Sequence, residues 1–144
     1  TIITETKHWQ IKLNPDQAYL GRCVIVAKRQ VESLSDLSED EWKDFSELIK
    51  RLESALKRSF GARCFNWTCL MNNAYKSERY ENNRAKPHVH WHVRPRYAKE
   101  IKFEEEKFED PEFAHHYDNT RHKEISEELL SKISQKIKEN FSCS

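Results

Sequence analysis

Histidines occupy every second position in one short segment, KPHVHWHVRPRY, at His88, His90 and His92. In a β-strand, residues i, i+2 and i+4 share a face, so the three imidazoles would project together while the apolar residues between them enter a core. Neighbouring rings would be rooted roughly 6.6 Å apart, close enough to converge on one small ligand. Imidazole nitrogens act as nucleophiles, proton carriers and metal ligands near neutral pH. The spacing therefore predicts a reactive row on one face of a strand.

Three interpretations of this row are open on the residues alone. The first interpretation is a hydrogen-bonded structural feature, and the second is a metal site built on H-x-H. The third is a nucleophilic centre, in which the central imidazole attacks while its neighbours orient it and transfer protons. Three aligned imidazoles repel one another when protonated, which disfavours the first. A metal site would take a further ligand from another element, and spacing assigns none of the remaining histidines to that role: His8, His115, His116 and His122. We therefore favour catalysis and expect neither a metal nor a cofactor.

The charge balance narrows the choice of partners. With 25 basic and 24 acidic residues the formal charge is +1, so no broad field selects polymeric nucleic acid or an anionic membrane. A small anionic substrate needs only local donors and fits this balance. The N-terminal residues show no apolar signal-peptide core, and no apolar stretch approaches the ~20 residues of a membrane span. We expect a cytoplasmic protein.

Length and composition favour one domain that pairs with a second copy. The chain has 144 residues, enough to bury a core without disulfides, and we predict a single domain over residues 1–144. An apolar fraction of 37% is low for a monomer and favours burial against a partner subunit. The four cysteines form no C-x-x-C pair and are interpreted as small core or edge residues rather than zinc ligands or disulfides: Cys23, Cys64, Cys69 and Cys143.

The elements that must position the row are predicted from periodicity and turn residues. Ser38 and Glu41 form a capping box that opens an amphipathic helix over 39–59, which Gly61 ends. A terminal helix is predicted over 122–139, and the charged residues 98–120 are expected to wrap irregularly over the surface. Strands are predicted over four segments: 8–13, 22–28, 63–72 and 88–95. The order predicts an α+β domain with an antiparallel sheet, one long helix after the second or third strand, and a C-terminal helix.

The segment HVHWHVRPRY resembles the signature of the histidine triad (HIT) superfamily, in which histidines alternate with hydrophobic residues and a proline-arginine often follows. Pro95 and Arg96 match that ending. The upstream segment LNPDQAYLGRCVIVAKRQVESLSDLSEDEW is also similar to the family's turn, glycine, strand and helix opening. The resemblance covers residues 7–97, and it implies a HIT-like fold with a core over that range followed by an extension and helix over 98–144.

The resemblance implies a nucleotidyl hydrolase or transferase that attacks the α-phosphorus of a nucleotide conjugate through a nucleotidyl-histidine intermediate. The implied substrates are a dinucleoside polyphosphate, a nucleoside phosphoramidate or an adenylylated small molecule. His90 corresponds to the nucleophile, His92 to the residue that donates a proton and stabilises charge, and His88 to a buttress that holds the nucleophile's tautomer. The implied assembly is a homodimer joined through the long helix and an adjoining strand. A nucleotide-binding module with little catalysis is the alternative.

Substrate-binding residues follow from the same resemblance. Asn14 stands where the family places a ribose-binding Asp or Asn, although it also suits a residue that merely starts the Asn-Pro turn. Either Asn72 or Asn73 matches an asparagine near the phosphates, and we prefer Asn73. Two departures concern phosphate binding. Asn83-Arg84-Ala85 stands where the family has Gly-Gln followed by Ser or Thr, side chains that bind phosphate or the leaving group. Arg84 is expected to contact the polyphosphate instead, with Lys86 or Arg79 as alternatives. The other interpretation is a solvated cation in the loop. Arg22 replaces a histidine, and either contacts phosphate or pairs with an acidic residue.

Overall fold

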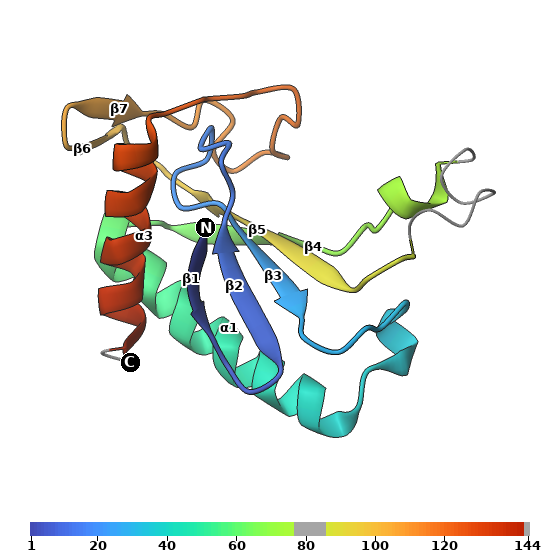
Figure 1. Ribbon diagram of the computed structural model, residues 1–144. Helices are drawn as coiled ribbons and strands as arrows, with labels where there is room; N and C mark the ends of the chain where they lie inside the picture. Colours follow the sequence, from blue (N-terminus) through green and yellow to red (C-terminus); the bar gives the residue numbers. More distant parts are fainter. Residues whose placement is uncertain (77–85, 143–144) are drawn as a thin grey trace.

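Five strands form one antiparallel sheet in the order β1-β2-β3-β5-β4 (Figure 1). The structure, a computed structural model, describes residues 1–76 and 86–142. The sheet strands are β1 (Ile2–Glu5), β2 (Trp9–Leu13), β3 (Cys23–Ala27), β4 (Cys64–Thr68) and β5 (His90–Arg96). A separate hairpin joins β6 (Ile101–Phe103) to β7 (Glu106–Phe108). The helices are α1 (Glu39–Phe60) and α3 (Glu127–Ser142), with short 3₁₀ turns η1 (Leu34–Asp36) and η2 (Asn73–Tyr75). The expected α+β class is confirmed.

One face of the sheet is buried against α1, and the other carries the polar side chains. Burial alternates along β2 and β3, as the period of a half-buried strand requires. The α1 residues that cover this face are apolar and spaced three or four apart: Phe45, Leu48, Leu52, Leu56. Helix α3 packs against α1 and against β1 at the edge of the sheet (Figure 1). The opposite face of the central strands is therefore left open for a site.

The ends of α1 are set by local hydrogen bonds. The Ser38 hydroxyl accepts from the Glu41 N–H at 3.1 Å, and the Glu41 carboxylate accepts from the Ser38 N–H at 2.9 Å. At the other end Gly61 adopts a left-handed conformation, with φ at 77°, and its N–H donates to the Lys57 carbonyl at 2.8 Å. The helix predicted over 39–59 is confirmed with one further residue, because both signals are local to the sequence.

Two parts of the chain differ from the prediction. Strand β1 was not expected, and residues 98–120 contain the β6–β7 hairpin before they become irregular. Each hairpin strand has only three residues, which is too short for a hydrophobic period to show in sequence. The terminal helix begins at Glu127 instead of residue 122. Both backbone groups of Lys123 are bonded to the turn after β2, since its carbonyl accepts from the Gln17 N–H and its N–H donates to the Asp16 side chain. No helix among the described residues is long and apolar enough to cross a membrane.

Candidate active site

Strand β5 displays the histidines on the open face of the sheet. His90 and His92 lie in the strand, and His88 precedes it in continued pairing, since the Val89 N–H donates to Val31 and the Val89 carbonyl accepts from Ala27. On the opposite face Trp91 stacks on Phe45 of α1 with ring centroids 5.1 Å apart. Val89 and Val93 are fully buried there. The alternation predicted from the sequence is confirmed, and the apolar set clamps the strand to the core.

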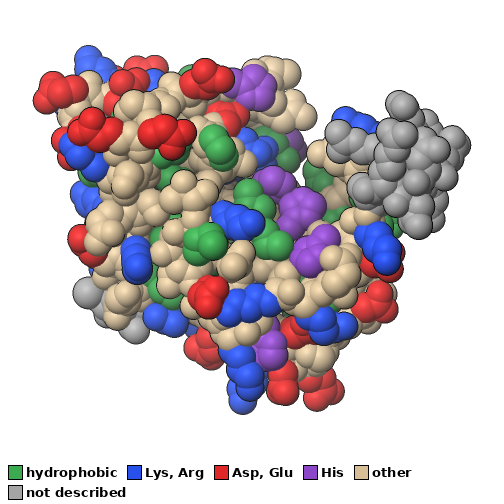
Figure 2. All heavy atoms as spheres, viewed as in Figure 1, with side chains coloured by type: hydrophobic (Ala, Val, Ile, Leu, Met, Phe, Trp, Pro, Cys, Tyr) green, Lys and Arg blue, Asp and Glu red, His purple; other side chains and the backbone are tan. Residues whose placement is uncertain are grey.

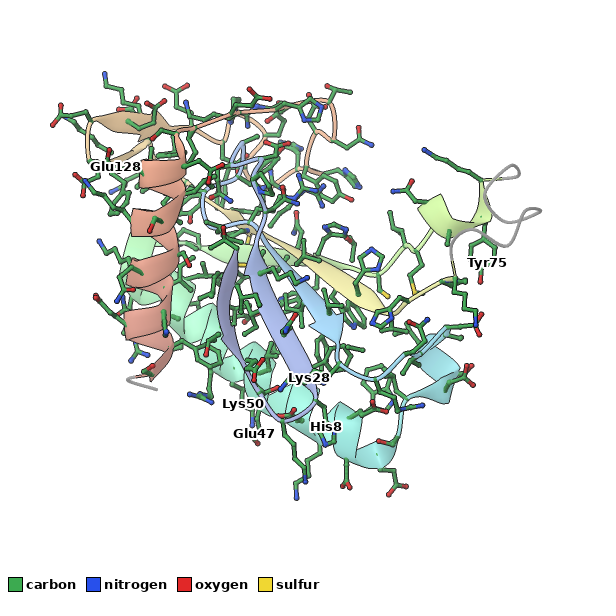
Figure 3. All side chains as sticks on the ribbon, in the orientation of Figure 1. His8, Lys28, Glu47, Lys50, Tyr75 and Glu128 are labelled. Atoms are coloured by element: carbon green, nitrogen blue, oxygen red, sulfur yellow. The ribbon has the colours of Figure 1, made fainter. Side chains whose placement is uncertain are left out.

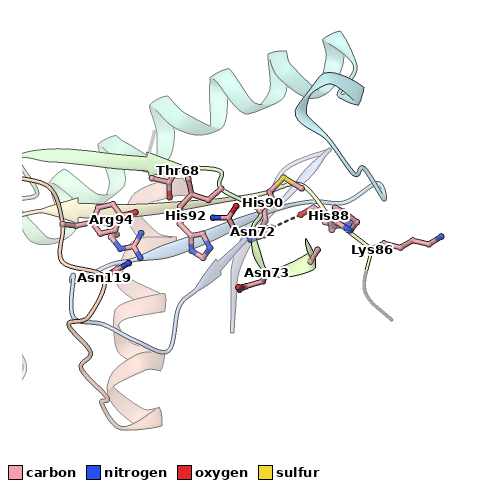
Figure 4. A pocket seen from close by; sticks show the side chains of 14 residues that line it. Thr68, Asn72, Asn73, Lys86, His88, His90, His92, Arg94 and Asn119 are labelled. Atoms are coloured by element: carbon pink, nitrogen blue, oxygen red, sulfur yellow. Dashed lines mark hydrogen bonds between the residues drawn. The ribbon is translucent and has the colours of Figure 1, made fainter. Parts of the chain in front are cut away.

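Two cavities meet at the histidine row. The loop-side cavity has a volume of about 340 Å³. It is lined by residues that follow β4 and by the β5 row: Thr68, Leu70, Met71, Asn72, Asn73, Ala74, Lys86, Pro87, His88, His90, His92, Arg94, Tyr117 and Asn119 (Figure 4). The sheet-side cavity, of about 470 Å³, is lined by Thr1, Lys12, Leu13, Asn14, Pro15, Val24, Val26, His88 and His90. Figure 2 shows histidine side chains gathered along a hollow in this surface. His90 thus borders both cavities, whereas His92 borders only the loop-side cavity.

A hydrogen bond to the backbone selects one tautomer of the neutral His90 ring. Its Nδ1 lies 2.8 Å from the backbone carbonyl oxygen of His88, the contact drawn as a dashed line in Figure 4. A carbonyl oxygen only accepts, so Nδ1 carries the hydrogen and donates it. In a neutral ring Nε2 then carries the lone pair. The contact that His88 makes with this ring comes from its backbone carbonyl and not from its side chain.

The His88 side chain is anchored at both ring nitrogens. Its Nδ1 lies 2.6 Å from the Gln30 side-chain oxygen, and its Nε2 lies 2.6 Å from the Ala27 carbonyl oxygen. The Gln30 amide nitrogen in turn donates to the Pro87 carbonyl at 3.0 Å, which fixes the orientation of that amide. His88 therefore offers neither nitrogen to the cavities and serves to hold the start of β5 in place.

His92 is a half-buried ring whose surroundings disfavour its protonated form. Its Nδ1 is buried and has no hydrogen-bond partner among the described residues, and its ring centroid lies 5.3 Å from that of His90. Burial, followed by the positive charges of Arg22, His90 and Arg94, lowers the pKa of His92 to about 4. The ring is therefore neutral at pH 7 in the absence of a ligand, and an anion in the cavity would favour its protonated form.

The predicted asparagines lie at the two cavities. Asn14 lines the sheet-side cavity, and its side-chain oxygen also accepts from the Asp16 N–H at 2.9 Å, so it does start the turn. Asn72 and Asn73 both line the loop-side cavity, at the beginning of η2 (Figure 4). The structure thus brings the three asparagines to the row from two sides of β5.

The predicted cations are divided between the site and its surroundings. Arg22 forms an ion pair with Asp16 at 3.5 Å, as one of its two expected roles requires. Lys86 lines the loop-side cavity. Arg84 and Arg79 lie outside the described residues. None of the other four histidines is among the described residues that line either cavity, and no group of three or more His, Cys, Asp or Glu side chains in the described chain is arranged to hold a metal ion.

Sequence reasoning missed four polar side chains of the loop-side cavity: Thr68, Arg94, Tyr117 and Asn119. Arg94 continues the alternate-residue row beyond His92, and that continuation is a signal that could have found it. Thr68 lies opposite His92 in the β4–β5 pairing. Tyr117 and Asn119 come from the irregular segment after β7, where no pattern pointed to the site.

Arg96 holds that segment against the sheet. All five of its N–H donors have acceptors: the Asp110 carboxylate takes two at 2.7 and 3.0 Å, and the Asn66 side chain and the carbonyls of Glu112 and His115 take the others at 2.7 to 2.8 Å. Arg96 and Asp110 are almost fully buried. The contact holds the segment that leads to Tyr117, and the Tyr117 ring lies against the Arg94 guanidinium, 4.0 Å from the ring centroid. The C-terminal extension therefore contributes one wall of the cavity.

An open sheet face with a row of histidines between two cavities defines a histidine triad protein. A family model described as the HIT domain matches residues 1–99, more than half of the chain, and the chain belongs to this family. The expected resemblance over 7–97 is confirmed. None of the curated proteins matches the chain. Membership supports a nucleotide-binding or nucleotide-hydrolysing role, which is typical of the family.

Solved structures share the fold at low sequence identity. A histidine triad protein from Marinobacter aquaeolei VT8 has 14% identity and a TM-score of 0.73 over 99% of this chain and 89% of that chain. A HIT protein from Sinorhizobium meliloti 1021 has 18% identity and a TM-score of 0.70 over 96% of this chain and 87% of that chain. The NitFhit protein of C. elegans has 18% identity and a TM-score of 0.60 over 96% of this chain but 27% of its own.

Proposed function

We propose that the protein is a nucleotidyl hydrolase or transferase that uses His90 as its nucleophile on the α-phosphorus of a nucleotide conjugate. The observation that carries the proposal is the hydrogen bond from His90 Nδ1 to the His88 carbonyl, which leaves the Nε2 lone pair available between two cavities. A neutral imidazole needs no further activation to attack at neutral pH. The rigid strand supplies the positioning on which phosphoryl chemistry depends.

The nucleoside is assigned to the sheet-side cavity. Leu13, Val24 and Val26 give this cavity an apolar lining suited to a base. Asn14 lies beside them, and because its side-chain oxygen is occupied by the Asp16 N–H, its amide NH₂ is the group that would donate to ribose hydroxyls. The α-phosphate would then lie at the junction of the cavities, next to His90.

The reaction is written as two displacements at phosphorus. His90 Nε2 forms a bond to the α-phosphorus, and the bond from that phosphorus to the leaving group breaks. The incoming phosphate charge raises the pKa of His92, so the protonated ring can stabilise the transferring group and give the leaving atom its proton. Water, or an acceptor hydroxyl or phosphate, then attacks the phosphorus of the nucleotidyl-His90 intermediate, and the bond from that phosphorus to Nε2 breaks. The proton of an attacking water or hydroxyl passes to His92, so both rings return to their starting state.

Trapping the intermediate tests the proposal. After incubation with an α-labelled dinucleoside polyphosphate and a base quench, label should be found on His90 by peptide mass spectrometry. His90→Ala should lose at least about 1,000-fold in kcat, since removing a nucleophile abolishes the covalent route. His8→Ala is the matched control, because His8 lies in the β1–β2 turn away from both cavities (Figure 3). Equal turnover by wild type and His90→Ala would contradict the proposal.

Two other outcomes would redirect the assignment. Nucleotide binding with no turnover by the wild type would identify a binding module, the alternative suggested by the altered loop at Asn83-Arg84-Ala85. Stoichiometric metal with chelator-sensitive turnover would identify a metal-dependent site. A metal is known in one similar structure, that of a Zn-bound histidine triad family protein from Mycobacterium smegmatis, at 14% identity and a TM-score of 0.60 over 99% of this chain and 86% of that chain.

A further inference from the structure

Arg94 is a buried guanidinium that has no anion. Its residue is only 7% exposed, it lines the loop-side cavity, and no described carboxylate or carbonyl accepts from it. Its neighbour in the same row, Arg96, is also buried but has an acceptor for every donor. The Tyr117 ring stacks on this guanidinium but supplies no hydrogen-bond acceptor. A largely buried cation without acceptors is costly, so the arrangement of Arg94 suits a ligand in the cavity that supplies them.

A second guanidinium lies across the strand pair from Arg94. Cys23 of β3 is paired with Val93 of β5, which places Arg22 and Arg94 one residue further along the same open face. Arg22 pairs with Asp16, yet its Nε is buried and without a partner among the described residues. Like charges opposite each other destabilise a sheet, so this pairing is unfavourable until an anion joins it.

The surrounding charges do not neutralise the pair. Asp16 divides its carboxylate between Arg22, the His122 ring and the N–H groups of Lys123 and Ala18. Burial is the largest effect and lowers the pKa of both arginines, and the charge of Arg94 lowers the pKa of Arg22 further. Asp16 raises the pKa of both, but it is a single carboxylate facing two guanidiniums. Both remain cations at neutral pH. No aspartate or glutamate is among the described residues that line the loop-side cavity, and Lys86 adds a further positive charge.

The order of side chains along β5 indicates which part of a substrate reaches these cations. His90 borders both cavities, whereas His92 and Arg94 border only the loop-side cavity. If the nucleoside occupies the sheet-side cavity, as in the proposed function on which this step rests, the leaving group extends past His92 toward Arg94. We infer that Arg94, assisted by Arg22, binds a phosphate of the leaving group, and that the substrates are nucleotides whose leaving group carries at least one phosphate of its own.

The chemistry explains why such a leaving group would be selected. When the bond from the α-phosphorus to the bridging oxygen breaks, the electron pair stays on that oxygen, and the departing phosphate gains negative charge. Two guanidiniums can neutralise this charge through charge-assisted hydrogen bonds, which are roughly twice as strong as hydrogen bonds between neutral groups. An uncharged amine, the leaving group of a simple phosphoramidate, gains nothing from them.

Substrate selectivity tests the inference. Diadenosine triphosphate and an adenosine 5′-phosphoramidate of an uncharged alkylamine share the transferred nucleotide and differ in the leaving group. Wild type should prefer diadenosine triphosphate in kcat/KM. Arg94→Gln should reduce that preference by about 10- to 100-fold, because it removes a charge-assisted phosphate contact. Arg94→Lys should keep only part of the preference, since the lysine ammonium retains the charge but cannot form the bidentate hydrogen bonds of a guanidinium. Lys50→Gln removes one positive charge from α1, away from both cavities, and should leave the preference unchanged (Figure 3).

Binding of pyrophosphate separates this inference from the proposed function. By calorimetry, wild type and Lys50→Gln should bind pyrophosphate equally, and Arg94→Gln and Arg94→Lys should bind it at least several-fold more weakly. Equal losses on both substrates, or pyrophosphate binding that is indifferent to Arg94, would overturn the inference while leaving the nucleophile intact. Absence of turnover and of a His90 adduct, together with Arg94-dependent pyrophosphate binding, would instead overturn the proposed function and leave the anion site.

Discussion

Replacing Asp110 by alanine tests whether a buried ion pair holds the extension against the sheet. Asp110 accepts from Arg96 at 2.7 and 3.0 Å and from the Tyr97 N–H at 3.2 Å. The side chains of Arg96 and Asp110 are 2% and 1% exposed, so solvent screens their interaction little. The variant would leave the Arg96 charge buried with only neutral acceptors.

The expected cost follows from this burial. Removing one partner of a buried pair costs about 3–5 kcal/mol, whereas an exposed pair contributes about 0–1 kcal/mol. The matched control is Glu105→Ala: Glu105 is 98% exposed and pairs with Lys102 at 4.0 Å, so its loss should be small. At this chain length Asp110→Ala should lower Tm by about 10 °C.

Urea unfolding followed by tryptophan fluorescence would measure both variants. Because Tyr117 and Asn119 reach the cavity through the segment that Asp110 anchors, Asp110→Ala should also weaken pyrophosphate binding, and Glu105→Ala should not. A difference between the two variants below about 1 kcal/mol would refute the reasoning, since it would mean that the ion pair does not set the stability of this region.

Three further predictions concern the site and the assembly. By NMR titration, His92 should stay neutral down to about pH 4, and bound nucleotide should raise its pKa. Because the unfolded ring takes up a proton that the folded ring does not, the free energy of unfolding should fall as pH drops from 6.5 toward 4, and less steeply in His92→Gln. The slope from His92 cannot exceed about 1.4 kcal/mol per pH unit, because only one proton is exchanged, and the partial exposure of the ring to solvent makes the total loss smaller. Gly21→Ala should cost about 2–5 kcal/mol in unfolding experiments, since φ is 85° and the new Cβ would meet Leu56 at 2.8 Å; Gly61→Ala, with φ at 77° and nothing within 4 Å, should cost about 1–2 kcal/mol. Light scattering should show a homodimer, formed along α1 and the edge strand β4, and a single-chain mass would contradict this.

Local patterns determined the parts of the structure that local physics controls. The alternation around His90 placed the imidazoles on one face because side chains alternate along any strand. The limits of α1 followed from Ser38, Glu41 and Gly61, since caps act on backbone groups within a turn of themselves. Local patterns gave the wrong start for α3. The backbone of Lys123 is bonded to Asp16 and Gln17, more than a hundred residues away, and this contact keeps Lys123 out of the helix.

Only the tertiary structure decided what surrounds His90, the proposed nucleophile. The pairing of β3 with β5 sets Arg22 beside Arg94, and the Arg96–Asp110 contact brings Tyr117 to the cavity. Arg94 continues the period of the histidine row, but Arg22 and Tyr117 come from segments tens of residues away, and no period in the sequence marks them as its partners. The sequence by itself therefore indicated which ring to propose as the nucleophile and determined which face of the strand it occupies. The charges proposed to select the substrate depend on long-range packing, which brings them together only once the sheet and the extension have folded.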